Sequence, residues 1–286
     1  MQFFTLIALF LAGPSVSASD AVEPDSTTQR LFEETMAFAR EHRLHEMPMG
    51  EIMTTLGERF VDSPYVAGML DEPAEETLVC RLDGFDCVTF VESTLAMARA
   101  IKQEQYDYET WTGFIRDQRY RDGKMDGYCS RLHFFTEWIL DNEKRGTVRD
   151  ITLEVGGVLL DKKIDFMTTH RESYPRISKN DSLFACIQEM ESNLEDAKIY
   201  YIPQDRIHEV YDQLQSGDII ATATHLKGLD VTHTGLVYDS GDGKKGLLHA
   251  SASGSVKVSP DLQAYVQGVK VTIGIIVARP QSPRKS

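Results

Sequence analysis

One cysteine and two histidines have side chains that could together carry out nucleophilic chemistry. Cys87 lies in the string Gly-Phe-Asp-Cys-Val-Thr-Phe-Val-Glu, residues 84–92, where a loop is predicted to become a helix. Asp86 is a favourable N-cap for the apolar, helix-compatible run that follows and ends near residue 100. Cys87 would then sit at the positive end of the helix dipole, whose field stabilises the reactive thiolate. The alternative is a buried structural cysteine, the usual fate of a free thiol.

A thiol nucleophile needs a base to take its proton and a group to orient that base. His233 lies in Val-Thr-His-Thr-Gly-Leu-Val-Tyr, residues 231–238, and His249 lies in Leu-Leu-His-Ala-Ser, residues 247–251. Both segments are predicted strands, joined by a hairpin at residues 241–243. If the two histidines share a sheet face, His249 can hold the ring of His233, and His233 can serve Cys87. For each histidine, the alternative is a half-buried polar residue without a catalytic role.

The remaining histidines show no metal-ligand spacing such as His-x-x-x-His, so neither a metal nor a cofactor is expected. We interpret all of them except His133 as structural or surface residues. They are His42, His45, His133, His170, His208 and His225.

The composition and the first residues point to an exported protein. The chain has 286 residues, 42% of them hydrophobic, and a formal net charge of −14, which argues against a nucleic-acid partner. An apolar run at residues 3–12 precedes small residues at 16–18, which predicts an export signal cut before Ser19, although its start carries no Lys or Arg. This run is too short for a membrane anchor. We therefore expect a periplasmic or secreted protein.

Export bears on the four cysteines, since disulfides form in oxidising compartments. If Cys87 is a nucleophile it stays free, and at most one bridge can form among Cys80, Cys129 and Cys186. The sequence does not say which pair.

Periodicity and turn residues predict helices first and an antiparallel sheet afterwards, which is an α+β fold. The predicted helices cover residues 27–43, 51–60, 87–100, 109–117, 131–142 and 182–194, and the predicted strands cover 218–221, 231–238, 246–250, 255–258 and 271–278. The predicted domains are an export signal (1–18), a linker and helix (19–50), a catalytic domain with insertions (51–278) and a disordered tail (279–286).

The order of several short motifs resembles the NlpC-type papain-like cell-wall hydrolases and, more closely, their N-acetylmuramoyl-L-alanine amidase-like branch. The resemblance runs over about residues 51–277. Its motifs are Pro-Tyr (64–65), Asp-Cys-Val-Thr-Phe-Val-Glu (86–92), Arg-Tyr-Arg (119–121), Ser-Arg-Leu-His-Phe-Phe (130–135) with Trp138, Gly-Asp-Ile (217–219), Gly-Leu-Asp-Val-Thr-His-Thr-Gly-Leu-Val-Tyr (228–238) and Leu-His-Ala-Ser (248–251).

This resemblance implies a papain-like fold in which Cys87 is the nucleophile, His233 the base and His249 its orienting residue. It implies cleavage of the amide between N-acetylmuramic acid and L-alanine, in peptidoglycan or muropeptides. The wider family suggests instead the bond between γ-D-glutamate and the diamino acid. A non-catalytic peptidoglycan-binding module, or an acyltransferase with the same thiol chemistry, would also be compatible with this fold.

The resemblance also marks residues on the substrate side. Tyr65 is implied near the oxyanion, and Asp230 lies within a matching motif. Arg119, Arg121 and Arg131 are candidates for binding a substrate carboxylate, because guanidinium binds carboxylates bidentately. The alternatives without a substrate role are a tyrosine packed in a turn, for Tyr65, and a set of surface ion pairs, for the three arginines. The chain has Asp-Cys-Val-Thr where the wider family has Asp-Cys-Ser-Gly, and an insertion at residues 70–81 is expected to shape the substrate groove.

Overall fold

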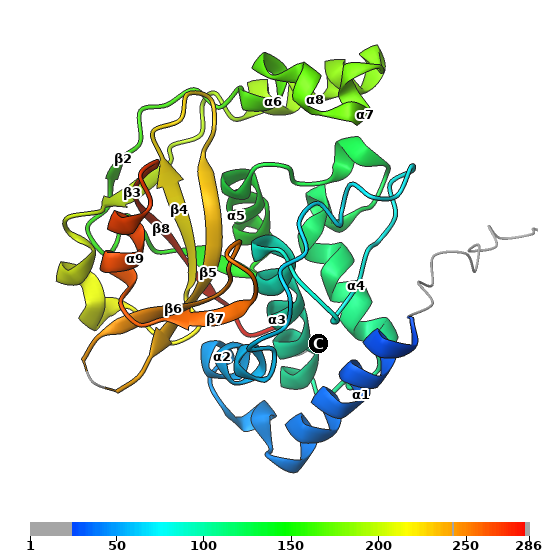
Figure 1. Ribbon diagram of the computed structural model, residues 1–286, viewed down its shortest axis with the longest axis vertical. Helices are drawn as coiled ribbons and strands as arrows, with labels where there is room; N and C mark the ends of the chain where they lie inside the picture. The colour runs from blue at the N-terminus through cyan, green and yellow to red at the C-terminus, as the bar shows by residue number, and fades with distance from the viewer. Residues whose placement is uncertain (1–24, 242, 284–286) are drawn as a thin grey trace, which may run out of the picture.

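The fold has the predicted order, with helices first and an antiparallel sheet afterwards. A computed structural model describes residues 25–241 and 243–283, so the predicted export signal lies outside the described residues. In Figure 1 the sheet lies beside the central helix α3, and α6, α7 and α8 form a separate group at the top. The helices are α1 (Ser26–Glu41), α2 (Met49–Arg59), α3 (Cys87–Lys102), α4 (Tyr108–Arg119), α5 (Phe135–Lys144), α6 (Phe166–Thr169), α7 (Pro175–Ser178), α8 (Asp181–Asn193) and α9 (Leu262–Gly268).

The strands of the described residues form one sheet in the order β2-β3-β8-β4-β5-β6-β7, with β1 paired to β8, and every pair is antiparallel. The predicted hairpin joins β5 to β6 through the pair Asp239↔Lys245. The strands are β1 (Val148–Asp150), β2 (Val158–Leu159), β3 (Tyr200–Pro203), β4 (Ile219–Thr224), β5 (Val231–Asp239), β6 (Lys245–Ala250), β7 (Val256–Ser259) and β8 (Thr272–Pro280).

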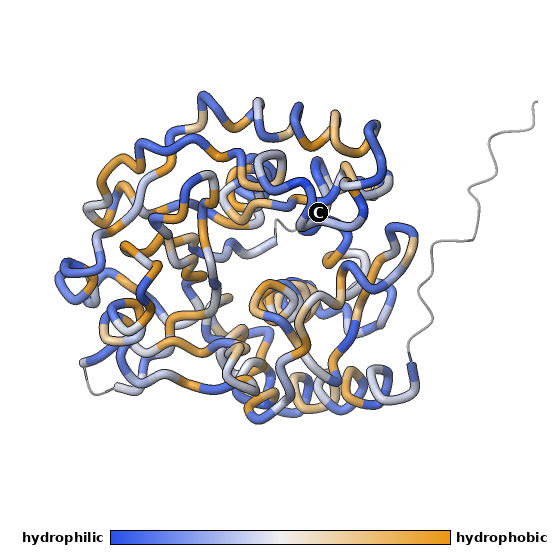
Figure 2. Tube along the Cα trace, turned by 45° about the horizontal axis from the view of Figure 1, so that its top comes forward, coloured by the Kyte–Doolittle hydropathy of each residue, from blue (hydrophilic) through white to orange (hydrophobic). Residues whose placement is uncertain are grey.

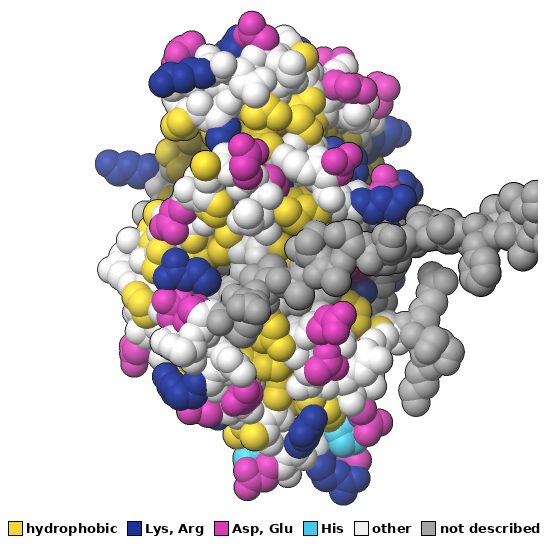
Figure 3. Space-filling model, turned by 90° about the vertical axis from the view of Figure 1, so that its right-hand side faces the viewer, with side chains coloured by type: hydrophobic (Ala, Val, Ile, Leu, Met, Phe, Trp, Pro, Cys, Tyr) yellow, Lys and Arg dark blue, Asp and Glu magenta, His cyan; other side chains and the backbone are white. Residues whose placement is uncertain are grey.

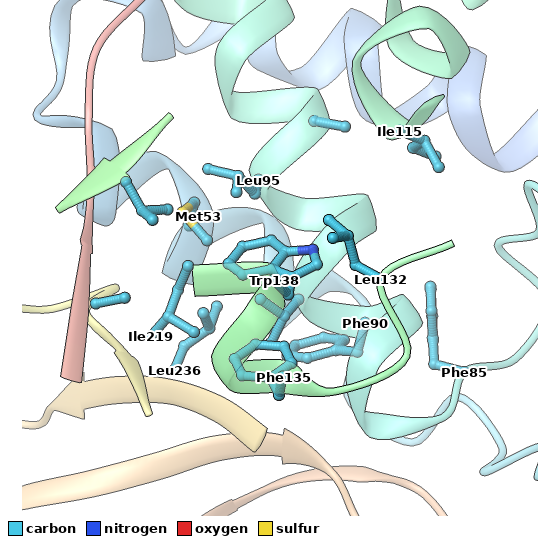
Figure 4. Packing of buried hydrophobic residues seen from close by; sticks show 14 of the residues in the cluster. Met53, Phe85, Phe90, Leu95, Ile115, Leu132, Phe135, Trp138, Ile219 and Leu236 are labelled. Atoms are coloured by element: carbon cyan, nitrogen blue, oxygen red, sulfur yellow. The ribbon is translucent and has the colours of Figure 1, made fainter. Parts of the chain in front are cut away.

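Helix α3 begins where the sequence predicts. Asp86 is its N-cap and accepts a hydrogen bond from the backbone N–H of Thr89 at 2.7 Å, while the Thr89 hydroxyl accepts one from the backbone N–H of Asp86 at 3.0 Å. This reciprocal capping box satisfies two helix-terminal donors. Phe90 and Leu95 are buried on α3. Figure 4 shows them in one core with Trp138 from α5. Cys87 is thus the first residue of a largely buried helix.

The sheet buries both of its faces. Along β4, Ile219 belongs to the core that contains α3, whereas Ile220 belongs to a second cluster with Leu262 and Val266 of α9. This alternation follows from the two-residue period of a strand. Hydrophilic segments lie mostly along the outside of the trace (Figure 2). The sheet is therefore held between the helical layer and α9.

Several predicted boundaries were wrong by a few residues. Helix α5 begins at Phe135 rather than near residue 131, because Arg131 forms a β-bridge with Tyr120. Strand β8 continues through Pro280, and Arg279 forms an ion pair with Asp218 at 2.7 Å, so the first two residues of the expected disordered tail belong to the sheet. The sequence does not predict the short elements β1, β2, β3, α6, α7 and α9.

The structure answers the disulfide question that the sequence left open. Cys129 and Cys186 are bridged, and Cys80 and Cys87 are free. The bridge ties α8 to the loop before α5, which leads into the candidate site.

On the face in Figure 3, acidic and basic side chains are interspersed around hydrophobic patches. No helix within residues 25–241 and 243–283 is long and apolar enough to cross a membrane.

Candidate active site

The two predicted histidines meet directly. His233 Nε2 lies 2.7 Å from His249 Nδ1, and the rings are nearly perpendicular. In the register set by the pair Leu236↔Leu248, Gly235 lies opposite His249, and His233 is the diagonal neighbour on the same face. A Cβ at Gly235 would come within 2.8 Å of His249 Cβ. Glycine at this position therefore leaves room for the second histidine beside β5.

A third residue extends this pair. His249 Nε2 lies 3.1 Å from Ser259 Oγ, at the end of β7. If His249 Nε2–H donates to Ser259, its Nδ1 is free to accept from His233 Nε2–H. This arrangement leaves His233 Nδ1 unprotonated, as a base requires. Ser259 was not singled out from the sequence, since only the β6–β7 register brings it beside the histidine.

Cys87 is half-buried at the first turn of α3 and lines one cavity with His233. Burial raises the pKa of the thiol to about 12, and the negative charge of Asp86 acts in the same direction. Backbone N–H groups of Thr234, Cys87 and Val88 oppose this rise but do not overcome it. We expected the field of the helix dipole to favour a thiolate, but desolvation outweighs it and raises the pKa of the thiol. The resting cysteine is a neutral thiol.

Two tyrosines flank this group. Burial raises the pKa of Tyr65 to about 12, and the nearby Cys87 and Asp86 act in the same direction. Tyr65 is therefore a protonated phenol close to the thiol. Tyr265, on α9, places its ring 4.8 Å from that of His249 and 5.9 Å from that of His233. Tyr265 was not predicted as a site residue, because the sequence does not predict the short helix that carries it.

The cavity beside Cys87 has a volume of about 160 Å³. Asp230, predicted on the substrate side, does line it, but its side chain is buried and accepts hydrogen bonds from the Thr136 N–H, the Thr136 hydroxyl and the Val231 N–H. The other lining residues are Val88, Leu132, His133, Phe135, Trp138, Leu229, Val231, Thr232 and Thr234. The space is thus mostly apolar, with polar groups of Cys87, His133 and His233 at its wall.

The three predicted arginines do not line this cavity and are paired with carboxylates of the protein. Arg119 is buried with its Nε 2.7 Å from Glu92 of α3. Arg121 binds Glu137 and donates to the Cys129 carbonyl at 2.8 Å. The side chains of Arg119 and Arg131 are buried, so these two residues do not form the surface ion pairs considered from the sequence.

The insertion at residues 70–81 is tied to the helices by these same side chains. Arg131 donates to the Leu70 carbonyl at 2.8 Å and pairs with Asp71. Arg119 donates to the Val79 carbonyl at 2.5 Å. Glu76 accepts from the Tyr120 hydroxyl at 2.9 Å. Two of the three arginines thus fix the insertion in place. Among the described residues, no cluster of three or more His, Cys, Asp or Glu could hold a metal ion.

With this geometry established, comparison with known proteins identifies the family. Residues 55–275 match the family described as AmiA-like, N-acetylmuramoyl-L-alanine amidase-like. The chain belongs to this family. No curated protein matches it.

Solved structures agree with the match. An N-acetylmuramoyl-L-alanine amidase from Bacteroides uniformis ATCC 8492 is 31% identical, with a TM-score of 0.77 over 82% of this chain and 99% of that chain. A protein from Bacteroides fragilis, named as a proposed xylanase, is 35% identical, with a TM-score of 0.74 over 78% of this chain and 98% of that chain. Protein LPG0564 from Legionella pneumophila, at 22% identity and a TM-score of 0.62 over 90% of this chain and 98% of that chain, shares the fold. Family and neighbours together support a cell-wall amidase function.

The buried imidazoles predict a loss of stability in acid. Burial lowers the pKa of His233 to about 4 and those of His249 and His133 to about 3. Between about pH 6.5 and pH 4, these histidines therefore bind protons in the unfolded chain but not in the folded chain. The free energy of unfolding thus falls as the pH falls. We expect the Tm to drop by about 5 °C or more across this range, measured by circular dichroism. His249→Asn should reduce the slope, and the exposed His208→Gln should not. If the wild type, His249→Asn and His208→Gln lost stability with the same slope, the buried histidines would not be its cause.

The histidine pair also predicts unequal kinetic effects. His233→Ala should lower kcat by at least about 100-fold, the usual contribution of a general base. His249→Asn should cost less, because an amide can still accept from His233 Nε2–H and orient the ring. Steady-state hydrolysis rates measured at neutral pH, where both variants are folded, decide this. A larger loss in His249→Asn than in His233→Ala would reverse the assigned roles.

Proposed function

We propose that the protein is an exported cysteine hydrolase that cleaves the amide between N-acetylmuramic acid and L-alanine in peptidoglycan or its fragments, with an NlpC-type arrangement of Cys87, His233 and His249. The observation that carries this proposal is the histidine pair, bonded at 2.7 Å, in which His233 lines the same cavity as Cys87. A binding module would need neither a base nor an orienting residue.

The resting protonation states define the first step. Because the thiol and both imidazoles are neutral, His233 takes the proton of Cys87 as the sulfur attacks the carbonyl carbon. The C–S bond forms and the carbonyl π electrons move to oxygen. Collapse of the intermediate breaks the C–N bond, and His233 returns its proton to the leaving amine. Water, deprotonated by His233, then hydrolyses the thioester and restores the thiol.

Charge on the carbonyl oxygen needs hydrogen-bond donors close to the sulfur. The backbone N–H of Cys87 lies at the N-terminus of α3, where no partner within the helix is available. The Tyr65 phenol, protonated beside Cys87, is the second donor that we propose.

Glycoside hydrolysis, suggested by the name of one neighbour, fits this site less well. It normally requires two carboxyl groups that flank the scissile bond. Asp230 is the one carboxylate among the described cavity-lining residues, and three donors already engage it.

Mass spectrometry of a digested muropeptide tests the proposal. Free stem peptide beginning with L-alanine supports the amidase, whereas a disaccharide-dipeptide supports the γ-D-glutamyl endopeptidase alternative. Acylated products would indicate a transferase. Intact muropeptide after incubation with folded protein would overturn the hydrolase assignment and favour a binding module.

A further inference from the structure

His133 lines the cavity beside Cys87, and the mechanism above does not use it. Its Nε2 lies 2.8 Å from the Tyr128 carbonyl oxygen. Since a carbonyl oxygen only accepts hydrogen bonds, Nε2 must carry the proton. The Tyr128 ring packs against the imidazole with a centroid distance of 4.4 Å. The tautomer and position of His133 are thus fixed by its neighbours.

The second nitrogen of this ring is left open. His133 Nδ1 makes no hydrogen bond with any residue that the structure describes. It is also not one of the fully buried, unpaired side-chain atoms of the described residues, so a ligand can reach it. Burial and the nearby Arg131 keep the ring neutral, since both lower its pKa. A neutral imidazole with its proton on Nε2 offers a lone pair at Nδ1. Because His133 lines the cavity, we place this unused hydrogen-bond acceptor at the cavity wall.

The surroundings of this acceptor restrict what can bind there. Leu132, Phe135, Trp138 and Leu229 supply apolar walls. The cavity has a volume of about 160 Å³, which suits a small apolar substrate group beside the acceptor. Asp230, the neighbouring polar side chain, is already engaged by three donors.

We propose that His133 is a specificity-determining residue whose Nδ1 accepts a hydrogen bond from a secondary-amide N–H of the substrate, with that amide's small apolar substituent enclosed in the cavity. The inference rests on the proposed function, which supplies substrates with amide N–H groups on both sides of the scissile bond. A substrate without this N–H would leave the acceptor desolvated and unpaired, which is how a buried polar group discriminates between ligands.

The test combines substrate and protein changes. The substrates are N-acetylmuramoyl-L-alanyl-γ-D-glutamate, its analogue N-methylated at the acetamido nitrogen, and its analogue N-methylated at the alanyl–glutamyl amide. The wild type should lose at least about tenfold in kcat/KM for one of the two analogues. His133→Gln keeps a donor near the Nε2 position but offers no acceptor near Nδ1. It should lose as much on the parent substrate and show no further methylation penalty.

His133→Asn is the matched control, because its amide oxygen can occupy the region of Nδ1 while the bond to the Tyr128 carbonyl is lost. It should recover part of the methylation penalty. If the wild type and His133→Gln discriminate equally between parent and analogues, the inference is overturned.

Nitrogen-15 NMR of the imidazole keeps this inference distinct from the proposed function. If the wild type cleaves no muropeptide, the proposed function fails. The His133 assignment then depends on the spectrum of the unliganded protein at neutral pH. An unprotonated Nδ1 and a protonated Nε2 support the acceptor, and a protonated Nδ1 overturns it.

Discussion

Cys87→Ala should abolish hydrolysis while leaving the fold intact. We expect kcat to fall by at least about 10,000-fold, because removal of a nucleophile eliminates the covalent route and leaves only binding and oxyanion stabilisation. Cys87 is half-buried at the mouth of a cavity, so losing one sulfur atom there costs little packing. Product formation by mass spectrometry and the thermal unfolding midpoint should be measured on the same preparation.

The chain contains its own control for this prediction. Cys80 is also a free thiol, but it is buried in the core and is not among the residues that line the cavity, whereas Cys87 is half-buried and lines it. Cys80→Ala should keep its hydrolytic rate, and a thiol-reactive probe should label Cys87 in preference to Cys80. A folded Cys87→Ala protein that still hydrolyses muropeptide would remove Cys87 from the mechanism. Loss of labelling in Cys80→Ala instead would show that the reactive thiol is Cys80.

The centre of the site was predictable because its signals are local. Asp86 before an apolar run identifies the start of α3. The predicted hairpin makes it possible for His233 and His249 to share a sheet face, and the observed register places them there. Each inference needs only neighbouring residues and the register of one hairpin. The same logic predicted the α+β order, since α1 to α4 and β4 to β8 carry clear periodicity.

What could not be predicted depends on contacts between distant segments. Nothing in the sequence says that Arg119 faces Glu92, which is 27 residues away, or that Cys129 rather than Cys80 is bridged to Cys186. The protonation state of Cys87 could not be predicted for a related reason, because the desolvation that raises its pKa is a property of the packed structure. Strands of two to four residues, such as β2 and β3, are too short to show a period.

Of the substitutions proposed here, Arg119→Met should cause the largest fall in the free energy of unfolding. The Arg119 and Glu92 side chains are 3% and 1% exposed and pair at 2.7 Å. Glu92 also accepts from the Trp138 indole at 3.2 Å, so this one carboxylate joins α3, α4 and α5. Removing the guanidinium leaves a buried charge without its partner, which typically costs about 3–5 kcal/mol. Urea denaturation at neutral pH measures this loss.

Two further variants separate charge from packing. In Glu92→Gln/Arg119→Met no unpaired charge remains, so the double variant should be more stable than Arg119→Met alone. Arg30→Met removes an exposed partner of Glu34, whose pair is 59% and 52% exposed, and should change stability by less than about 1 kcal/mol. If Arg119→Met cost no more than Arg30→Met, the buried pair would not hold the helices together. Because Arg119 also holds the insertion through the Val79 carbonyl, a destabilised variant should lose hydrolytic activity at a lower temperature than the wild type. Arg119, which the sequence made only a candidate for binding substrate, would then act through the helix that carries Cys87.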